Sequence, residues 1–217
     1  MSFLQRILGN APTKTNGALL SNVNLIPIPY PPPAEGTAAE VPKPVVSQSL
    51  WEKSPALIVL IRRPGCLLCR QEAIALNEQR ELIAKQYGIR MVAILNQEFG
   101  SQDFVTNWWK GEAYFDKDLG LFKAMGDGTL RRASLLQLML PSVIARGQKA
   151  KQVAEGNLQG DGTMLGGLLI MRPGDKGMQY DYAETEFGDH APIETVLENC
   201  KKVAEEFGTA VQVQASA

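Results

Sequence analysis

The sequence predicts an α/β domain in which a central mixed sheet is flanked by helices. Residues 56–61 (Ala-Leu-Ile-Val-Leu-Ile) form a continuous apolar run, which is typical of a strand covered on both faces. Strand and helix patterns then alternate along the chain in the order β-α-β-α-β. The 217 residues, 45% of them hydrophobic and 21% charged, suffice for one sizeable core.

The charge and the apolar pattern exclude two classes of function. With 22 basic and 23 acidic residues, the chain has no overall positive field that would hold nucleic acid. The longest apolar stretches, 56–61 and 165–171, are far shorter than the roughly 18 residues of a membrane-spanning helix. We therefore expect no nucleic-acid partner and no transmembrane segment.

The numbers of histidines and cysteines limit the possible metal sites and disulfides, and they indicate the cellular compartment. A single histidine, His190, excludes a zinc site built from several histidines, and it is expected to be a solvated or capping residue. Three cysteines are too few, and odd in number, for a disulfide-stapled secreted domain. Residues 1–10 lack the apolar core of a secretory signal. These observations predict a cytoplasmic protein.

The first 48 residues are expected to form a proline-rich, extended arm. Nine of the 13 prolines lie within the first 55 residues, and the run 25–33 favours polyproline II. An ordered arm needs a surface to dock on. Its own domain and a protein partner that contacts residues 20–48 are equally compatible with the sequence.

The first half of the predicted domain, residues 49–208, carries regular helix and strand signals. After strand 56–61 we expect a helix from Cys66 to Tyr87, ended by Gly88. A strand at 90–95, a short helix at 102–109 and a third strand at 112–115 follow.

The second half begins with an apolar, basic segment at 130–152 that is predicted to be helical. Its five basic and no acidic residues would suit an anionic lipid or a lipid-like substrate, but burial of its apolar stripe is the favoured interpretation. A glycine-rich loop leads to strands at 166–171 and 178–182. A helix at 192–207 is expected to end at Gly208, leaving a flexible tail at 209–217.

The segment whose residues are best suited to a chemical reaction is Cys66-Leu-Leu-Cys69, which follows the buried strand and opens a helix. At a helix N-terminus, free amide groups stabilise an anion, so the pKa of the Cys66 thiol is expected to be lowered. Arg62, Arg63 and Arg70 add positive charge. Cys69 lies one turn further, within reach of an oxidised Cys66, as a resolving thiol must.

Two other interpretations of the cysteine pair remain open at this point. A zinc site would need two further ligands, and only Cys200 and His190 offer soft atoms, so no metal is predicted. The other interpretation is an inert pair in the core, as is expected of Cys200 on the packed face of the last helix. The turn Pro64-Gly65 and the flanking arginines favour redox chemistry.

Residues 62–70 (RRPGCLLCR) resemble the peroxiredoxin-like 2 family. These AhpC/TSA-type proteins include prostamide/prostaglandin F synthase. Blocks at 111–116 (GEAYFD), 156–162 (GNLQGDG) with 165–167 (LGG), and 184–189 (ETEFGD) agree in the same order. The resemblance covers roughly residues 49–203. It implies a thioredoxin-like fold with Cys66 and Cys69 in the redox-active positions.

Two positions differ from better-studied thioredoxin-fold enzymes. Typical peroxiredoxins have a threonine three residues before the reactive cysteine, where this chain has Arg63. Thioredoxins have a proline before the strand that faces the cysteines, where this chain has Gly166 and Gly167 after Met164-Leu165. The two glycines are predicted to let a substrate approach Cys66.

The sequence therefore predicts a thiol-dependent oxidoreductase, with an adaptor subunit as the alternative. In the first, Cys66 attacks a small peroxide, a lipid peroxide or a lipid endoperoxide, Cys69 closes a disulfide, and Arg63 and Arg70 support the thiolate and the developing oxyanion. No cofactor is expected to bind tightly. An external reductant such as thioredoxin or glutathione, or NADPH by analogy with the prostaglandin synthase, would complete the cycle. In the second, the arm docks the domain in a larger assembly.

Overall fold

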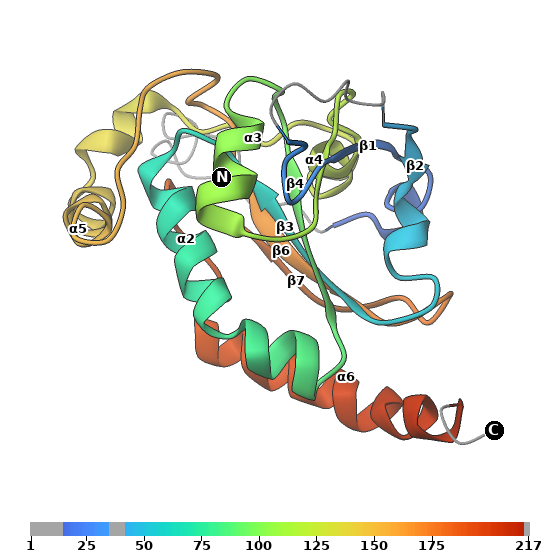
Figure 1. Ribbon diagram of the computed structural model, residues 1–217. Coiled ribbons are helices and arrows are strands. Elements are labelled where there is room, and N and C mark those ends of the chain that lie inside the picture. The colour runs from blue at the N-terminus through green and yellow to red at the C-terminus, as the bar shows by residue number, and fades with distance from the viewer. Residues whose placement is uncertain (1–14, 35–41, 215–217) are drawn as a thin grey trace.

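The computed structural model describes residues 15–34 and 42–214 and shows one seven-stranded mixed sheet (Figure 1). Its spatial order is β2-β1-β5-β4-β3-β6-β7. The strands are β1 (Asn24–Ile28), β2 (Val45–Val46), β3 (Ala56–Ile61), β4 (Arg90–Leu95), β5 (Ala113–Phe115), β6 (Gly167–Met171) and β7 (Met178–Ala183). The predicted central mixed sheet is confirmed.

Strand direction divides the sheet into a parallel centre and antiparallel flanks. β3 runs parallel to β4, and β4 parallel to β5. β6 and β1 add on antiparallel to β3 and β5, respectively. The β3–β4 connection passes through a helix, as a parallel pair requires. The loop after β3, which carries the cysteine motif, therefore lies at the carboxyl end of a central strand.

The helical elements of the described chain are of three kinds. The α-helices are α2 (Leu67–Glu78), α3 (Ser101–Asp103), α4 (Gly120–Ala124), α5 (Pro141–Ala150) and α6 (Ile193–Gln214). Two π-helical segments, η3 (Glu81–Gln86) and η4 (Phe104–Trp109), extend the helical regions after β3 and β4. The 3-10 turns are η1 (Gly17–Leu19), η2 (Ser47–Leu50) and η5 (Leu135–Met139).

Both faces of the sheet are buried, as the apolar run 56–61 predicts. Leu57, Val59 and Ile61 belong to one core cluster, together with buried side chains of α2 and α6. The alternate residues of β3 belong to a second cluster, with Leu20, which follows η1, and with side chains of η2 and α4. Every residue of β3 is buried, since successive side chains point to opposite, covered faces.

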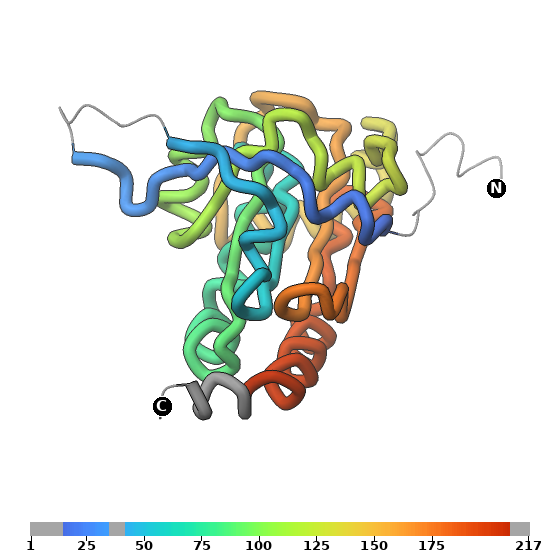
Figure 2. The backbone as a smooth tube through the Cα atoms, turned by 90° about the vertical axis from the view of Figure 1, so that its right-hand side faces the viewer, coloured from blue at the N-terminus to red at the C-terminus, as the bar shows by residue number. Residues whose placement is uncertain are grey.

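The described part of the N-terminal region pairs with the domain's own sheet. β1 pairs antiparallel with β5, and β2 pairs with Asn24 and Leu25 of β1. Figure 2 shows this blue segment crossing the side of the molecule that faces the viewer. Pro27 lies beyond the reach of β2, where a residue without an N–H is tolerated. A strand therefore replaces the expected polyproline II conformation over 24–28. Residues 1–14 and 35–41 of the predicted arm lie outside the described residues.

Three predicted helix bounds were wrong. The helix expected at 66–87 is divided between α2 and η3. The segment 130–152 is divided at Leu140, whose extended backbone (ψ 134°) is that favoured before proline, between η5 and α5. The final helix continues past Gly208 to Gln214, because Gly208 does not adopt the left-handed conformation that ends a helix. Part of the predicted tail is therefore helical.

The structure bears on membrane insertion in one respect only. Among the described helices, none combines the length and the apolar character that a bilayer span requires.

Candidate active site

Cys66 sits at the junction between the β3 loop and α2. It is the N-cap residue of α2, with an extended backbone (φ −74°, ψ 122°), rather than a member of the first turn. The Pro64-Gly65 turn places it there, and its N–H donates to Arg63 O at 3.0 Å. Free amide groups at the start of α2 therefore surround this position, as the sequence predicts.

The glycine-rich loop predicted after residue 155 packs on this turn. Asn157 N donates to Gly65 O at 2.8 Å, and a Cβ at Gly156 would lie 2.8 Å from Leu67 N. Small residues at these positions are needed for the close approach. The loop thus forms one wall around Cys66.

Arg62 provides the hydrogen bond to the Cys66 sulfur. Its Nη2 donates to Cys66 Sγ at 2.9 Å, and its Nη1 donates to Gly162 O at 3.0 Å. The guanidinium also stacks over the Phe187 ring, 4.3 Å from the centroid. Arg62 is buried, and burial opposes its charge, but its anionic neighbours hold its pKa above the ordinary value. A buried cation therefore faces the sulfur permanently.

The surroundings separate the two thiols of the motif. A hydrogen bond from the Cys69 thiol and the positive charge of Arg62 lower the pKa of Cys66 well below its usual range, although burial opposes this. Burial, followed by hydrogen bonding to Cys66, raises the pKa of Cys69. Both cysteines are free thiols in the structure. These interactions therefore favour the thiolate form at Cys66 and the neutral thiol, which donates to it, at Cys69.

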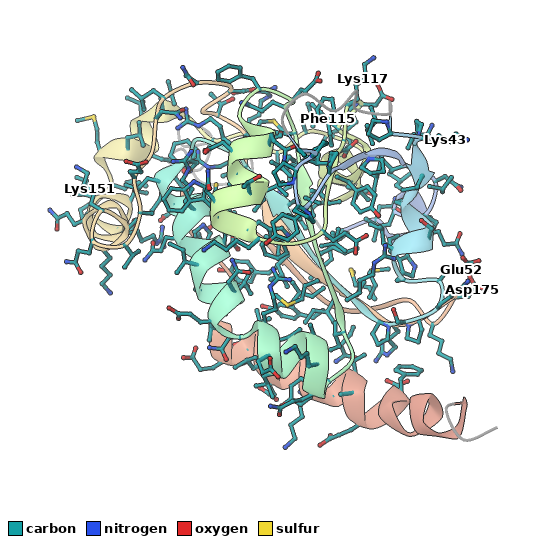
Figure 3. The ribbon with its side chains drawn as sticks, viewed as in Figure 1. Lys43, Glu52, Phe115, Lys117, Lys151 and Asp175 are labelled. Atoms are coloured by element: carbon teal, nitrogen blue, oxygen red, sulfur yellow. The ribbon has the colours of Figure 1, made fainter. Side chains whose placement is uncertain are left out.

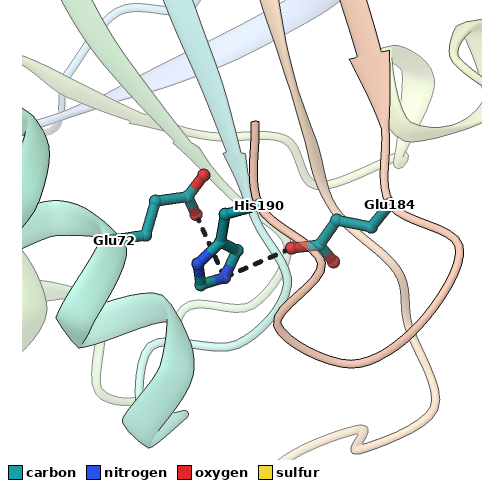
Figure 4. Close-up of side chains that lie close together, drawn as sticks. All are labelled: Glu72, Glu184 and His190. Carbon is teal, nitrogen blue, oxygen red and sulfur yellow. Dashed lines mark ion pairs between the residues drawn. The ribbon is translucent and has the colours of Figure 1, made fainter. Parts of the chain in front are cut away.

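Behind the cysteines, three titratable side chains converge from distant parts of the chain (Figure 4). His190 Nε2 lies 3.4 Å from a Glu184 carboxylate oxygen and 3.7 Å from one of Glu72. The side chains of Glu72 and Glu184 are only 8% and 3% exposed. The second Glu184 oxygen accepts from Gly166 N at 2.8 Å. These residues form the carboxyl–histidine cluster.

Burial shifts the protonation equilibria of the carboxyl–histidine cluster toward the uncharged forms. It raises the pKa of Glu184 to about 7 and lowers that of His190 to about 4. Burial and the neighbouring Glu184 also raise the pKa of Glu72. The expectation that His190 is solvated was wrong, because the turn before α6 folds it inward. One atom from each residue could ligate a metal ion, since the three lie within 4.8 Å of one another.

A cavity of about 630 Å³ opens at Cys66. Its walls come from the cysteine turn, η5, α5 and the loop after α5. Apolar side chains dominate its lining, which includes Leu67, Leu68, Leu138, Val143 and Leu158. Arg62, Arg63 and Lys151 supply its positive charge. The cavity can accommodate an organic molecule beside the sulfur.

The two arginines predicted to support the thiolate make other contacts in the structure. Arg63 donates to Gln159 O at 3.2 Å while lining the cavity. Arg70 donates to Pro64 O and Glu155 O, both at 3.0 Å, and forms an ion pair with Asp103 at 2.9 Å. Arg70 therefore fastens the loops around the motif. Arg62, which the sequence offers only as one of three cations, contacts the sulfur.

Close packing explains the absence of side chains at Gly166 and Gly167. A Cβ at Gly166 would collide with Leu60 O of β3, and one at Gly167 with Tyr182 O of β7 and with Met125. Protein atoms occupy the space on these sides of the backbone. The predicted role in substrate approach draws no support from these contacts and stays a prediction.

The zinc ligand set considered from the sequence is not assembled. Cys200 lies in the packed stripe of α6, fully buried, and burial raises its pKa to about 12. It belongs to the apolar core and is absent from the group of residues that could share a metal ion in the described chain.

Sequence reasoning missed Glu72 and Glu184 as site residues. Glu72 lies three residues after Cys69, the spacing that brings two side chains to one face of a helix. That spacing was the available signal for Glu72. Glu184 opens the block 184–189 of the family resemblance, but its place beside Glu72 and His190 depends on the β6–β7 pairing.

Comparison with known proteins gives a consistent family assignment. Residues 75–186 match the family model described as AhpC/TSA antioxidant enzyme, a range that begins after both cysteines of the motif. Peroxiredoxin-like 2A of Xenopus laevis is 32% identical over 172 residues, covering 78% of this chain and 74% of that protein. Prostamide/prostaglandin F synthase of Bos taurus is 30% identical over 154 residues, covering 70% and 76%.

Solved structures agree on the fold. Peroxiredoxin Q of Xanthomonas campestris superposes with a TM-score of 0.55 at 9% identity, covering 89% of this chain and 98% of that one. The peroxidoxin BcpB of Mycobacterium tuberculosis gives 0.53 at 9% identity, covering 88% and 98%. The thioredoxin-like, peroxiredoxin-type fold expected from the sequence is confirmed.

Proposed function

This chain belongs to the AhpC/TSA antioxidant enzymes, within the peroxiredoxin-like 2 family, and from that premise we propose that it reduces peroxides through Cys66. The observation that carries the proposal is the hydrogen bond from buried Arg62 to Cys66 Sγ, at the base of an open cavity. A thiolate that is stabilised and reachable is what nucleophilic attack on an O–O bond requires.

The first step oxidises Cys66. Its thiolate attacks one oxygen of a hydroperoxide, an S–O bond forms, and the O–O bond breaks. The sulfur becomes a sulfenic acid, and the leaving alkoxide takes a proton and departs as an alcohol. Arg62 stabilises the thiolate, and its guanidinium lies where negative charge develops on the oxygens.

The second step closes a disulfide. Cys69, the neutral thiol beside Cys66, loses its proton and attacks the sulfenic sulfur. The S–O bond breaks, and the hydroxide that leaves takes up the proton as water. An external thiol reductant then reduces the disulfide, and we expect one thioredoxin dithiol or two molecules of glutathione to supply these two electrons.

The cavity favours organic peroxides over hydrogen peroxide alone. A volume of about 630 Å³ with a mainly leucine and valine lining suits an acyl chain or a ring better than a molecule of two oxygens. Lipid hydroperoxides and lipid endoperoxides are therefore the proposed substrates. For an endoperoxide, the same attack forms an S–O bond to one oxygen and frees the other as an alkoxide, which takes a proton. Cys69 then attacks the sulfur, the S–O bond breaks, and the released alkoxide takes the Cys69 proton, so that the product leaves as a diol.

The adaptor alternative draws no support from the described part of the N-terminal region. It rests on an ordered arm together with the missing threonine and proline of better-studied thioredoxin-fold enzymes, but β1 of the arm pairs with β5 of the same chain. No further proposal is attached to it.

The test is peroxide consumption by the full chain with thioredoxin and its reductase. We expect turnover with a lipid hydroperoxide, none with Cys66→Ser, and unchanged turnover with Cys200→Ser. Cys69→Ser should permit a single oxidation, after which sulfenic acid is trapped by dimedone and detected by mass spectrometry. Full turnover by Cys66→Ser would refute the proposal.

A further inference from the structure

Exposed apolar side chains gather around the mouth of the Cys66 cavity. Of the eleven large hydrophobic side chains that are exposed in the described chain, seven lie between residues 135 and 158. Met139 is 75% exposed and Leu158 91%. We call this group the rim patch: Leu135, Leu136, Leu138, Met139, Ile144, Val153 and Leu158.

The rim patch overturns the expectation that the apolar stripe of 130–152 is buried. Within η5 only Gln137 is buried, and within α5 only Val143 and Ala150. Because η5 is a short 3-10 turn, its side chains cannot form a single inward face. The apolar residues of this segment are therefore left on the surface, where a contiguous group marks a binding site.

The rim patch is continuous with the catalytic cavity. Leu138 and Leu158 belong to both, from opposite walls. Figure 1 shows α5 and η5 standing at the outer end of the molecule, away from the sheet. Anything that covers the rim patch therefore also meets the entrance to Cys66.

Charge around the rim patch is positive. Between residues 130 and 160 the chain has five basic side chains, of which Arg131 is buried, and one acidic one, Glu155. Arg132 and Arg146 are engaged in ion pairs, with Asp161 and Glu186. Lys151, which lines the cavity and is labelled in Figure 3, forms no ion pair within the described residues, and neither does Lys149.

Exposed leucines and methionine beside unpaired lysines are the features of an interfacial membrane-binding segment. We propose that η5, α5 and the loop at 153–158 form a surface that inserts shallowly into an anionic lipid bilayer, so that the Cys66 cavity opens toward the acyl chains. Use of this surface to collect lipid hydroperoxides rests on the proposed function, whereas bilayer binding does not.

Vesicle co-sedimentation of the full chain tests the proposal. The probes are phosphatidylcholine vesicles with and without phosphatidylserine. We expect binding to the anionic vesicles, weakened by salt, and about tenfold weaker binding for each rim-patch side chain removed, as in Met139→Ser and Leu158→Ser. Lys151→Glu should weaken binding to anionic vesicles alone. Phe99→Ser is the matched control, since Phe99 is 64% exposed but lies outside the patch.

Two results would overturn the proposal. One is equal sedimentation of the wild type and the Met139→Ser, Leu158→Ser double variant. The other is dimerisation of the chain through the rim patch. In that case light scattering would show a dimer for the wild type and a monomer for the double variant, and neither protein would bind vesicles. Cys66→Ser separates this proposal from the proposed function, because the variant should bind anionic vesicles like the wild type while failing to reduce peroxide.

Discussion

Cys66 and Cys200 are both buried in the same core cluster, yet their surroundings give them opposite chemistry. Cys66 is 2% exposed and Cys200 0%. Cys69 and Arg62 lower the pKa of Cys66, whereas burial without a polar neighbour raises that of Cys200 to about 12. Burial alone therefore raises the pKa of a thiol, and a hydrogen bond from a second thiol together with a nearby cation reverses the effect.

The fold explains why the two sites differ. Cys66 stands where β3 ends and α2 begins, so free backbone amides and a loop surround it. Cys200 stands in the middle of α6, where backbone groups bond to one another and the side chain meets only apolar residues. The end of a central strand leaves room for polar neighbours that a helix interior cannot accommodate.

The largest expected difference is in activity. Cys66→Ser should lower peroxide reduction by more than about a thousandfold, because the hydroxyl is a far weaker nucleophile than the thiolate. Cys200→Ser should retain the wild-type rate. Steady-state peroxide consumption measures both. Equal losses of peroxide reduction in the two variants would show that the different surroundings of Cys66 and Cys200 do not matter for catalysis.

The second expected effect concerns the carboxyl–histidine cluster, whose protonation makes the free energy of unfolding depend on pH. Burial raises the pKa of Glu184 to about 7, so the folded chain binds a proton between about pH 4.5 and 7 that the unfolded chain has lost. The stabilisation that this proton gives the folded chain is therefore complete below about pH 4.5 and is lost as the pH rises to 7. Relative to wild type, Glu184→Gln should gain up to about 3 kcal/mol of unfolding free energy across that window.

His190→Asn is the control of opposite sign. The pKa of His190 is lowered to about 4, so the unfolded chain takes up a proton on acidification that the folded chain refuses. This variant should gain stability relative to wild type as the pH falls from about 6.5 to 4. Urea titrations at several pH values measure both variants, and parallel curves for wild type and Glu184→Gln would contradict the cluster's assigned protonation.

The third difference concerns Arg62. Arg62→Met keeps most of the side-chain volume but removes the donor and the charge, so the pKa of Cys66 should rise and its alkylation rate at pH 7 should fall by about tenfold. Arg172→Met serves as control, because Arg172 pairs with Glu206, away from the motif. If the alkylation rate is unchanged in Arg62→Met, Arg62 does not lower the pKa of Cys66.

The smallest effect is expected at Cys200. Cys200→Ala removes one buried sulfur from the α6 core and should cost about 1 kcal/mol of unfolding free energy. This loss should be the same from pH 5 to 8, since no group there titrates with Cys200. Thermal unfolding of the variant checks it, and a pH-dependent loss would show that Cys200 is coupled to the site.

Local patterns predicted most of the fold and half of the site. The apolar run of β3 and the spacing of Cys66 and Cys69 placed the motif correctly, because a strand followed by a turn and a helix is encoded by adjacent residues. The choice of Arg62 over Arg63 and Arg70 could not be made, since it depends on how the loop at 162 and Phe187 hold the guanidinium.

Partners distant in sequence account for the rest. Glu72, in the middle of α2, and Glu184, the residue after β7, come together only through the tertiary fold, and no local signal marks that contact. The rim patch escaped prediction for a related reason. Periodicity shows that residues 130–152 have apolar side chains, but only the tertiary position of η5 and α5 decides whether anything covers them.

The most direct test of the account compares Cys66 and Cys200 in a single sample. The reduced, folded protein is alkylated with iodoacetamide at a series of pH values, and each cysteine peptide is quantified by mass spectrometry. The account predicts that Cys66 is modified half-maximally well below the ordinary thiol pKa of about 8.5, while Cys200 stays unmodified until the chain unfolds. Equal inertness of both, or modification of Cys66 only above that pH, would contradict it.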